Sequence, residues 1–214
     1  TYDGPNGEWA SIACWRSTRT GWQSQHLVSL GSPQGSRAVM LSGQAVRIRD
    51  GLDTSYQNWF RPDNRLPARV FGGAAQELAP AAALDTFTLL ACPRSRASAS
   101  NHVTVEAPVG ADERAALRTL AREERSEAFM RAEELDGENL ELQAVDAYYQ
   151  LVGLRRYRRV WLAWLPGRDR PVGAAIAWRG PLGLNFSFLE NRCDLLVAQD
   201  LSDGEAGAVA DALL

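Results

Sequence analysis

Before position 94, apolar residues recur with two different periods, one of two residues and one of three to four residues. Around the turn "STRTG", short runs with Trp9, Cys14 and Trp15 alternate with polar positions, and this period of two predicts a β-hairpin over 8–30. Spacings of three and four then predict helices, bounded by Gly51 and by Gly72 and Gly73. The expected order after the hairpin is a helix over 36–50, a strand over 55–61, a helix over 65–78 and a strand over 84–93.

A second block with its own pattern follows a short stretch rich in Ser, Ala and Arg. That stretch, residues 94–101, has the composition of a linker or surface loop and predicts domains over 1–95 and 101–214. We expect an α/β protein (α+β, with mixed sheets). The second block predicts a strand over 101–109, helices over 111–135 and 139–154, strands over 158–165, 172–180 and 184–197, and a helix from about 202.

Composition narrows the function classes. The 214 residues carry a net charge of −3, which disfavours a nucleic-acid-binding protein. All 23 basic residues are Arg, so no Lys is present to act as a base, a Schiff-base former or a phosphate ligand. No 18-residue apolar run predicts a membrane span, and the polar first ten residues do not predict a signal peptide. Two His and three Cys without a CxxC pair indicate neither a zinc site nor a disulfide framework. We expect a cytoplasmic protein, and a chain that starts at Thr1 is expected to be a piece of a longer one.

Two motifs carry a family resemblance. In "RPDNRLPARVFGG" (61–73), a strand leads through Asn64 into a helix that begins with Pro-Ala-Arg and ends on two glycines. Helix capping alone accounts for each of these residues. In "WLAWLPGRDRPVGAAIAW" (161–178), a polar turn joins two apolar strands. Both motifs resemble parts of the GNAT superfamily of acyl-CoA N-acyltransferases. Residues 8–93 resemble the C-terminal part of that fold and residues 101–214 its N-terminal part, in a tandem or permuted arrangement.

The resemblance implies a cofactor, acetyl-CoA or another acyl-CoA, and an acceptor that is a small-molecule amine or a peptide. In the superfamily, two diverging strands expose backbone groups to the pantetheine. A following helix N-terminus binds the pyrophosphate, with the pattern Arg/Gln-x-x-Gly-x-Gly/Ala, because unpaired N–H groups and the helix dipole favour anions. Asn64 of the first motif would lie beside the pantetheine arm.

Each block holds one candidate for that phosphate site. In "VAQDLSDGEAGAV", Gly204 and Ala206 fit the pattern and Leu201 departs from it. Asp203 and Glu205 would either repel a phosphate or serve only as capping residues of the helix. In "LGSPQGSRAVML", Gly35 and Arg37 supply a small and a cationic residue, although the spacing departs at Ser32 and Arg37, and no acidic residue is present. In the second block the backbone of Leu195, Leu196 and Val197 would line CoA.

Two residues are candidates for the base that deprotonates the amine. Glu190 falls on the predicted strand 184–197, and His26 falls on the corresponding strand of the first block. The alternatives are an ordinary Glu at a strand edge and a His whose hydrogen bonds are satisfied. The family's general acid, a Tyr on the helix predicted over 65–78, is missing, and Phe71 is the nearest aromatic residue.

Other function classes stay open. Arg155-x-x-x-Arg159 followed by Asn185-x-Ser187 resembles the motif with which PilZ β-barrels bind cyclic di-GMP, although Glu190 replaces the final Gly of that motif. A third alternative is a GNAT-like scaffold without catalysis, serving as an interaction module. The weak match of both phosphate patterns is typical of such a degenerate repeat.

Overall fold

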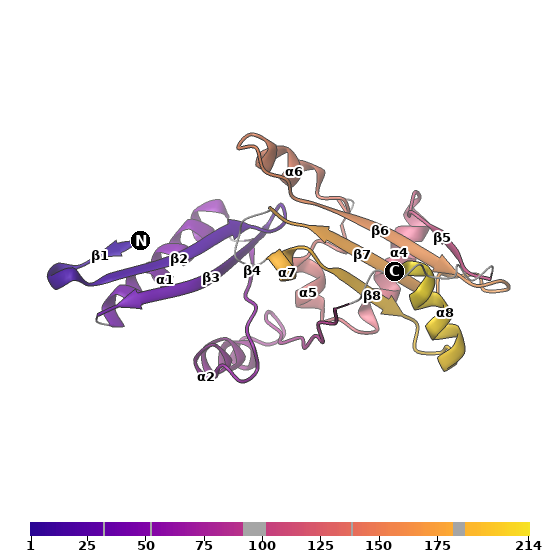
Figure 1. Ribbon diagram of the computed structural model, residues 1–214, viewed down its shortest axis with the longest axis horizontal. Coiled ribbons are helices and arrows are strands. Elements are labelled where there is room, and N and C mark those ends of the chain that lie inside the picture. Colours follow the sequence, from indigo (N-terminus) through magenta and orange to yellow (C-terminus); the bar gives the residue numbers. More distant parts are fainter. Residues whose placement is uncertain (32, 52, 92–101, 138, 182–186) are drawn as a thin grey trace. The chain divides into compact units, whose positions relative to one another are not determined.

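The computed structural model describes residues 1–31, 33–51, 53–91, 102–137, 139–181 and 187–214. The chain forms two compact units, and each contains a four-stranded sheet (Figure 1). The first unit comprises Thr1–Leu84 together with the segment Arg131–Glu134, and the second comprises Asp85–Met130 and Leu135–Leu214. The prediction of an α/β chain is confirmed at this level. The proposed linker, 94–101, lies outside the described residues.

The first unit is a long hairpin with a helix packed along it. Strands β2 and β3 pair antiparallel, β1 extends the sheet on one side and β4 joins on the other, in the order β1-β2-β3-β4. Helix α1 contacts both strands of the hairpin. The elements are β1 (Tyr2–Asp3), η1 (Pro5–Gly7), β2 (Trp9–Arg16), β3 (Gly21–Leu30), α1 (Pro33–Asp50), β4 (Ser55–Gln57), α2 (Arg65–Pro67), η2 (Ala68–Gly72) and α3 (Gly73–Glu77).

The predicted hairpin and both predicted helices of this block are confirmed. The helix expected over 65–78 is continuous through α2, η2 and α3, with a five-residue π-helical turn in its middle. The strand expected over 55–61 is wrong beyond Gln57, because β4 ends there.

The hairpin turn of the first unit holds the distant segment Arg131–Glu134. The Thr18 hydroxyl donates to the carbonyl of Ala132 at 3.0 Å. The backbone N–H and the hydroxyl of Thr20 both donate to the Glu134 carboxylate, at 2.7 and 2.9 Å. A side chain on Gly21 would collide with Thr18 and Ala132, so this turn requires glycine to receive the segment.

The second unit is an antiparallel sheet in the order β5-β6-β7-β8. Its buried residues form one core, with Leu117, Leu162, Ile176, Leu196 and Val209 each at most 1% exposed. The elements are β5 (Thr104–Glu106), α4 (Ala111–Arg122), α5 (Glu127–Ala132, whose last two residues belong to the first unit), α6 (Gln143–Gln150), β6 (Tyr157–Trp164), β7 (Gly173–Arg179), α7 (Ser187–Glu190), β8 (Cys193–Val197) and α8 (Asp203–Leu213).

The single helix predicted over 111–135 is wrong, because Ser126 starts a new helix. Its hydroxyl oxygen accepts from the N–H of Phe129 at 3.1 Å, as an N-cap residue does. Asp85 fixes Ser126 in turn, accepting from its N–H and its hydroxyl at 3.2 and 2.6 Å. Asp85 belongs to the segment that was expected to form a strand over 84–93, and its described part, 84–91, is not a strand.

The strand predicted over 184–197 is also wrong in part. Residues 187–190 form the short helix α7, and the strand begins only at Cys193. Residues 184–186 lie outside the described part of the chain. No helix among the described residues has the length and apolar character that crossing a membrane requires.

We expect Gly173→Ala to destabilise the second unit, because a Cβ there would overlap Val209 of α8 and lie 3.2 Å from the carbonyl oxygen of Leu196. Overpacking of this kind costs about 1–3 kcal/mol. The matched control is Gly207→Ala within α8, where nothing lies within 4 Å. That change should stabilise the helix by about 0.5–1 kcal/mol. Urea unfolding of both variants measures the effect, and equal stabilities would contradict the packing described here.

Candidate functional site

Strands β3 and β4 of the first unit form a fork. They pair in parallel through Gly21/Ser55, Trp22/Tyr56 and Gln23/Gln57 only. The side chains of the last pair also bond, with Gln23 Nε2 donating to Gln57 Oε1 at 3.0 Å. From there β3 continues to Leu30, whereas β4 has ended.

Asn58 fixes the point at which the strands part. Its side-chain amide donates to the carbonyl oxygen of Ser24 at 2.9 Å, replacing the next backbone bond that a continuing β4 would make. Beyond Ser24, no strand among the described residues pairs with this edge of β3, so its backbone N–H and C=O groups make no ladder hydrogen bonds there.

A β-bulge lies in β3 directly after the fork. Ser11 pairs with Val28 and Ala13 with Gln25, so His26 and Leu27 together oppose Ile12. His26 has φ of 52°, a left-handed conformation that is uncommon for a residue with a side chain. Its side chain is exposed. Bulges of this kind turn side chains and interrupt pairing, and they are frequent beside functional sites.

Helix α1 follows β3 and places its N-terminus after the fork. Its first turn contains no acidic residue, and the exposed Arg37 follows directly after that turn. The helix dipole and this guanidinium both favour an anion. Gly35 is buried, and a Cβ there would press on Tyr2 and Ala10, so its small size is required by packing within the unit.

The corresponding helix of the second unit, α8, is capped by its own side chains. The Glu205 carboxylate accepts from the Ser202 N–H at 3.0 Å and from the Ser202 hydroxyl at 2.6 Å. These hydrogen bonds from Ser202 lower the pKa of Glu205 below its usual value. A negative charge is therefore fixed where a phosphate would approach, beside Gly204 and Ala206. Leu195, Leu196 and Val197 pair with Ala175, Ala174 and Gly173 of β7.

Asn64 stands immediately before α2, as its position in the first motif predicts. It is exposed, and its side chain makes no capping hydrogen bond. The fork instead uses Asn58, which sequence reasoning missed. The available signal was an amide at position 58, on the face that it would share with Tyr56 and Phe60 in a strand.

The strand position predicted for Glu190 is wrong: Glu190 is the last residue of α7. Its carboxylate is 1% exposed and forms an ion pair with the guanidinium of Arg156, which is also buried. The second carboxylate oxygen has no hydrogen-bond partner among the described residues. Gly180 lies against Glu190 so closely that a Cβ there would collide with it. The ion pair supports a structural role for Glu190.

More guanidinium groups are packed beside this ion pair. Arg158 is fully buried and donates through Nε to the carbonyl of Leu140. The guanidinium carbons of Arg158 and Arg192 lie 4.8 and 4.7 Å from the ring centroid of Trp178. Asp194 accepts from Trp178 Nε1 and Arg192 Nε, at 2.9 and 2.8 Å. The core of this unit thus contains charges that are held by aromatic and hydrogen-bonding partners.

The structure does not bring the PilZ-like motif together on a barrel. The described strands of the second unit form an open sheet of four, and Ser187 begins a helix. Asn185 lies outside the described residues. Arg155 and Arg159, however, line one pocket. Among the described residues, no group of three His, Cys, Asp or Glu side chains is placed to hold a metal ion.

Comparisons with known proteins give no relative for this chain. It matches no protein-family model, no curated protein and no solved structure.

We expect Glu190→Gln to destabilise the protein, because it leaves the charge of Arg156 buried without its counter-ion. Removing one partner of a buried ion pair costs about 3–5 kcal/mol. The control is Glu127→Gln, which removes an exposed partner of Arg122. That change should cost less than about 1 kcal/mol. Urea unfolding separates the two, and a Glu190→Gln protein of unchanged stability would show that this ion pair does not hold the fold.

Proposed function

We propose that the chain is an acyl-CoA-dependent N-acyltransferase, GNAT-like, whose first unit holds the cofactor. The observation that carries the proposal is the fork between β3 and β4. The superfamily binds pantetheine between two diverging strands, and here a parallel pair ends after three residues with Asn58 bonded across the gap. The order of strand, bulge and helix N-terminus after the fork adds support.

The pantetheine and the pyrophosphate of the cofactor each have a partner of matching chemistry in this unit. Pantetheine is a chain of amides, and the free edge of β3 beyond Ser24 offers alternating N–H donors and C=O acceptors to it. The pyrophosphate would lie at the N-terminus of α1, where the helix dipole and the exposed Arg37 favour negative charge. The thioester would then lie toward the bulge at His26.

The reaction transfers the acyl group from sulfur to nitrogen. The amine nitrogen attacks the thioester carbonyl, the new C–N bond forms, and the C–S bond breaks to release CoA as a thiolate. A base removes the proton that the amine carries in excess, and the thiolate then takes up a proton. His26, exposed at the bulge, is the candidate base of the first unit, whereas the ion pair of Glu190 with Arg156 supports a structural role for that carboxylate.

A catalytically degenerate scaffold is the second candidate function, and the capped N-terminus of α8 favours it for the second unit. Glu205 occupies the position that a phosphate would take, and Asp203 adds a second negative charge. In this alternative the second unit is an interaction module, and cofactor binding is confined to the first.

We expect acetyl-CoA to bind to the whole chain, and Arg37→Gln to weaken this binding about tenfold, because one charge-assisted contact to phosphate contributes about 1.5–3 kcal/mol. The matched control is Arg49→Gln at the other end of α1, where the dipole repels anions and binding should be unchanged. Isothermal titration calorimetry with acetyl-CoA measures all three proteins.

Two results would contradict the proposal. One is the absence of heat at millimolar acetyl-CoA with the folded chain. The other is binding that Arg37→Gln leaves intact and Gly204→Glu abolishes, which would place the cofactor on α8 of the second unit instead. Release of free thiol on addition of an amine or peptide acceptor then tests the transfer step itself.

A further inference from the structure

The segment Arg155–Arg159 of the second unit presents two different faces. In extended chain, successive side chains point to opposite sides. Arg156 and Arg158 are 2% and 0% exposed and point into the protein, whereas Arg155 and Arg159 are exposed and Tyr157 is half-buried. The sequence "RRYRRV" therefore places Arg155, Tyr157 and Arg159 together on the outer side.

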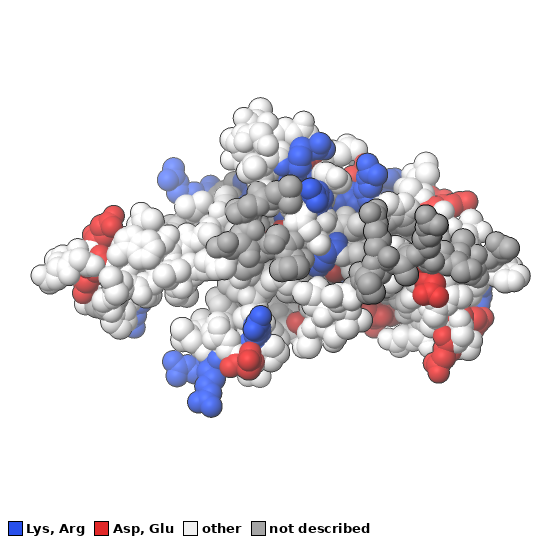
Figure 2. All heavy atoms as spheres, in the orientation of Figure 1, with Lys and Arg blue, Asp and Glu red and all other residues white. Residues whose placement is uncertain are grey.

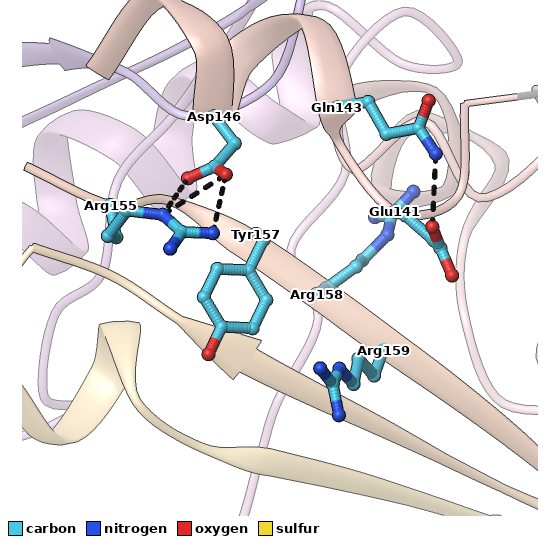
Figure 3. A pocket seen from close by; sticks show the side chains of 7 residues that line it. All are labelled: Glu141, Gln143, Asp146, Arg155, Tyr157, Arg158 and Arg159. Atoms are coloured by element: carbon cyan, nitrogen blue, oxygen red, sulfur yellow. Dashed lines mark hydrogen bonds and ion pairs between the residues drawn. The ribbon is translucent and has the colours of Figure 1, made fainter. Parts of the chain in front are cut away.

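These three side chains line a pocket of about 470 Å³ (Figure 3). The volume lies in the range of small-molecule sites. Residues on and just before α6 form the other wall, and of the seven lining residues all but Tyr157 are charged or carry an amide. The lining is unsuited to an apolar ligand. Figure 2 shows blue side chains gathered where α6 leads into β6, whereas red ones gather around α8.

Asp146 of α6 fixes one cation of the pocket. Its carboxylate accepts from Arg155 Nε at 3.0 Å and from Nη2 at 2.8 Å, and also from the N–H of Arg156 at 2.9 Å. Hydrogen bonds from Arg155 hold the pKa of Asp146 below its usual value. The charge of Asp146 is therefore satisfied within the protein, and the Arg155 guanidinium is held in one orientation with its side chain 58% exposed.

Arg159 is the cation that the pocket leaves for a ligand. Among the described residues, no carboxylate lies within ion-pair distance of it, and its guanidinium carbon lies 6.0 Å from the centroid of the Tyr157 ring. The guanidinium carbon of Arg155 lies 5.1 Å from the same centroid. The ring of Tyr157 thus makes cation–π contacts with both exposed guanidinium groups.

The charges of the lining add up in favour of an anion. Arg155 and Arg159 present two positive charges to the pocket, and Arg158 adds a third from its buried position. Asp146 and Glu141 contribute two negative charges. Asp146 is already paired. Glu141 is exposed, accepts from Gln143 at 3.1 Å, and is the one carboxylate of the lining that opposes an anion. Guanidinium groups bind phosphate oxygens in a two-pronged geometry that Lys cannot offer.

We propose that this pocket binds a small molecule that carries two phosphate groups, one held by Arg159 and the other by the outward side of Arg155. Two phosphates are specified because the two guanidinium groups come from residues two positions before and two positions after Tyr157 in extended chain, rather than from neighbouring positions. The site lies within the second unit and does not depend on the acyltransferase proposal.

The test is titration calorimetry with inorganic pyrophosphate. It uses the whole chain with Arg37→Gln, which removes the cation at the start of α1 and keeps the two proposals apart. Adding Arg159→Gln should weaken pyrophosphate binding at least tenfold, whereas adding Arg118→Gln on α4 makes the same charge change elsewhere and should leave it unchanged. Adding Arg159→Lys, which keeps the positive charge but loses the two-pronged geometry of the guanidinium, should give an intermediate affinity.

The proposal is overturned if pyrophosphate does not bind at millimolar concentration, or if Arg159→Gln and Arg118→Gln weaken binding equally. Thermal melting of each variant confirms that the chain is folded before titration. A parallel titration with cyclic di-GMP separates two sources of paired phosphates. Binding of the dinucleotide that depends on Arg155 and Arg159 identifies a nucleotide ligand, and binding of pyrophosphate alone identifies a polyphosphate.

Discussion

The buried ion pair between Arg156 and Glu190 determines how the second unit presents its charges. A buried guanidinium is tolerated only with a partner. Glu190 of α7 supplies the carboxylate that pairs with Arg156. Arg158 donates a hydrogen bond to the carbonyl of Leu140 and packs over the ring of Trp178. With these two arginines fixed inward, Arg155, Tyr157 and Arg159 must point outward. A shift of one residue in β6 would exchange the two sets, bury the pocket cations and expose the paired ones.

In the first unit the corresponding constraint is the short length of β4. Three paired residues attach it to β3, and the Asn58 amide ends the ladder by taking the next carbonyl. The backbone of β3 is then available along its remaining length, and the bulge at His26 turns that part of the strand. Helices α1 and α8, which follow β3 and β8, differ in charge at their starts: α1 has no acid in its first turn, whereas α8 carries Asp203 and Glu205. That difference distinguishes a phosphate site from a capped helix.

Periodicity predicted the elements whose cause is local. The hairpin, α1 and α8 follow from alternation, helical spacing and capping residues within a few positions of one another. The errors arose where a distant residue decides the structure. Ser126 divides the predicted helix because Asp85, 41 residues away, holds it as a cap. Glu190 leaves the strand pattern because it pairs with Arg156, 34 residues away. Asn58 was overlooked because an amide that ends a ladder has no signature except its position between the aromatic residues Tyr56 and Phe60 of one strand face.

The contacts of the segment Arg131–Glu134 affect the order in which the chain folds during synthesis. Thr18 and Thr20 hydrogen-bond to residues 114 positions later, so the hairpin turn leaves the ribosome long before its partners exist. Contacts of such separation form late, since the loop between them must first be closed. During synthesis the hairpin turn of the first unit therefore lacks these hydrogen-bond partners and stays exposed to solvent until residues 131–134 have been made. A protein cut at Leu84 would retain that immature state permanently, because the segment that completes the turn would be missing.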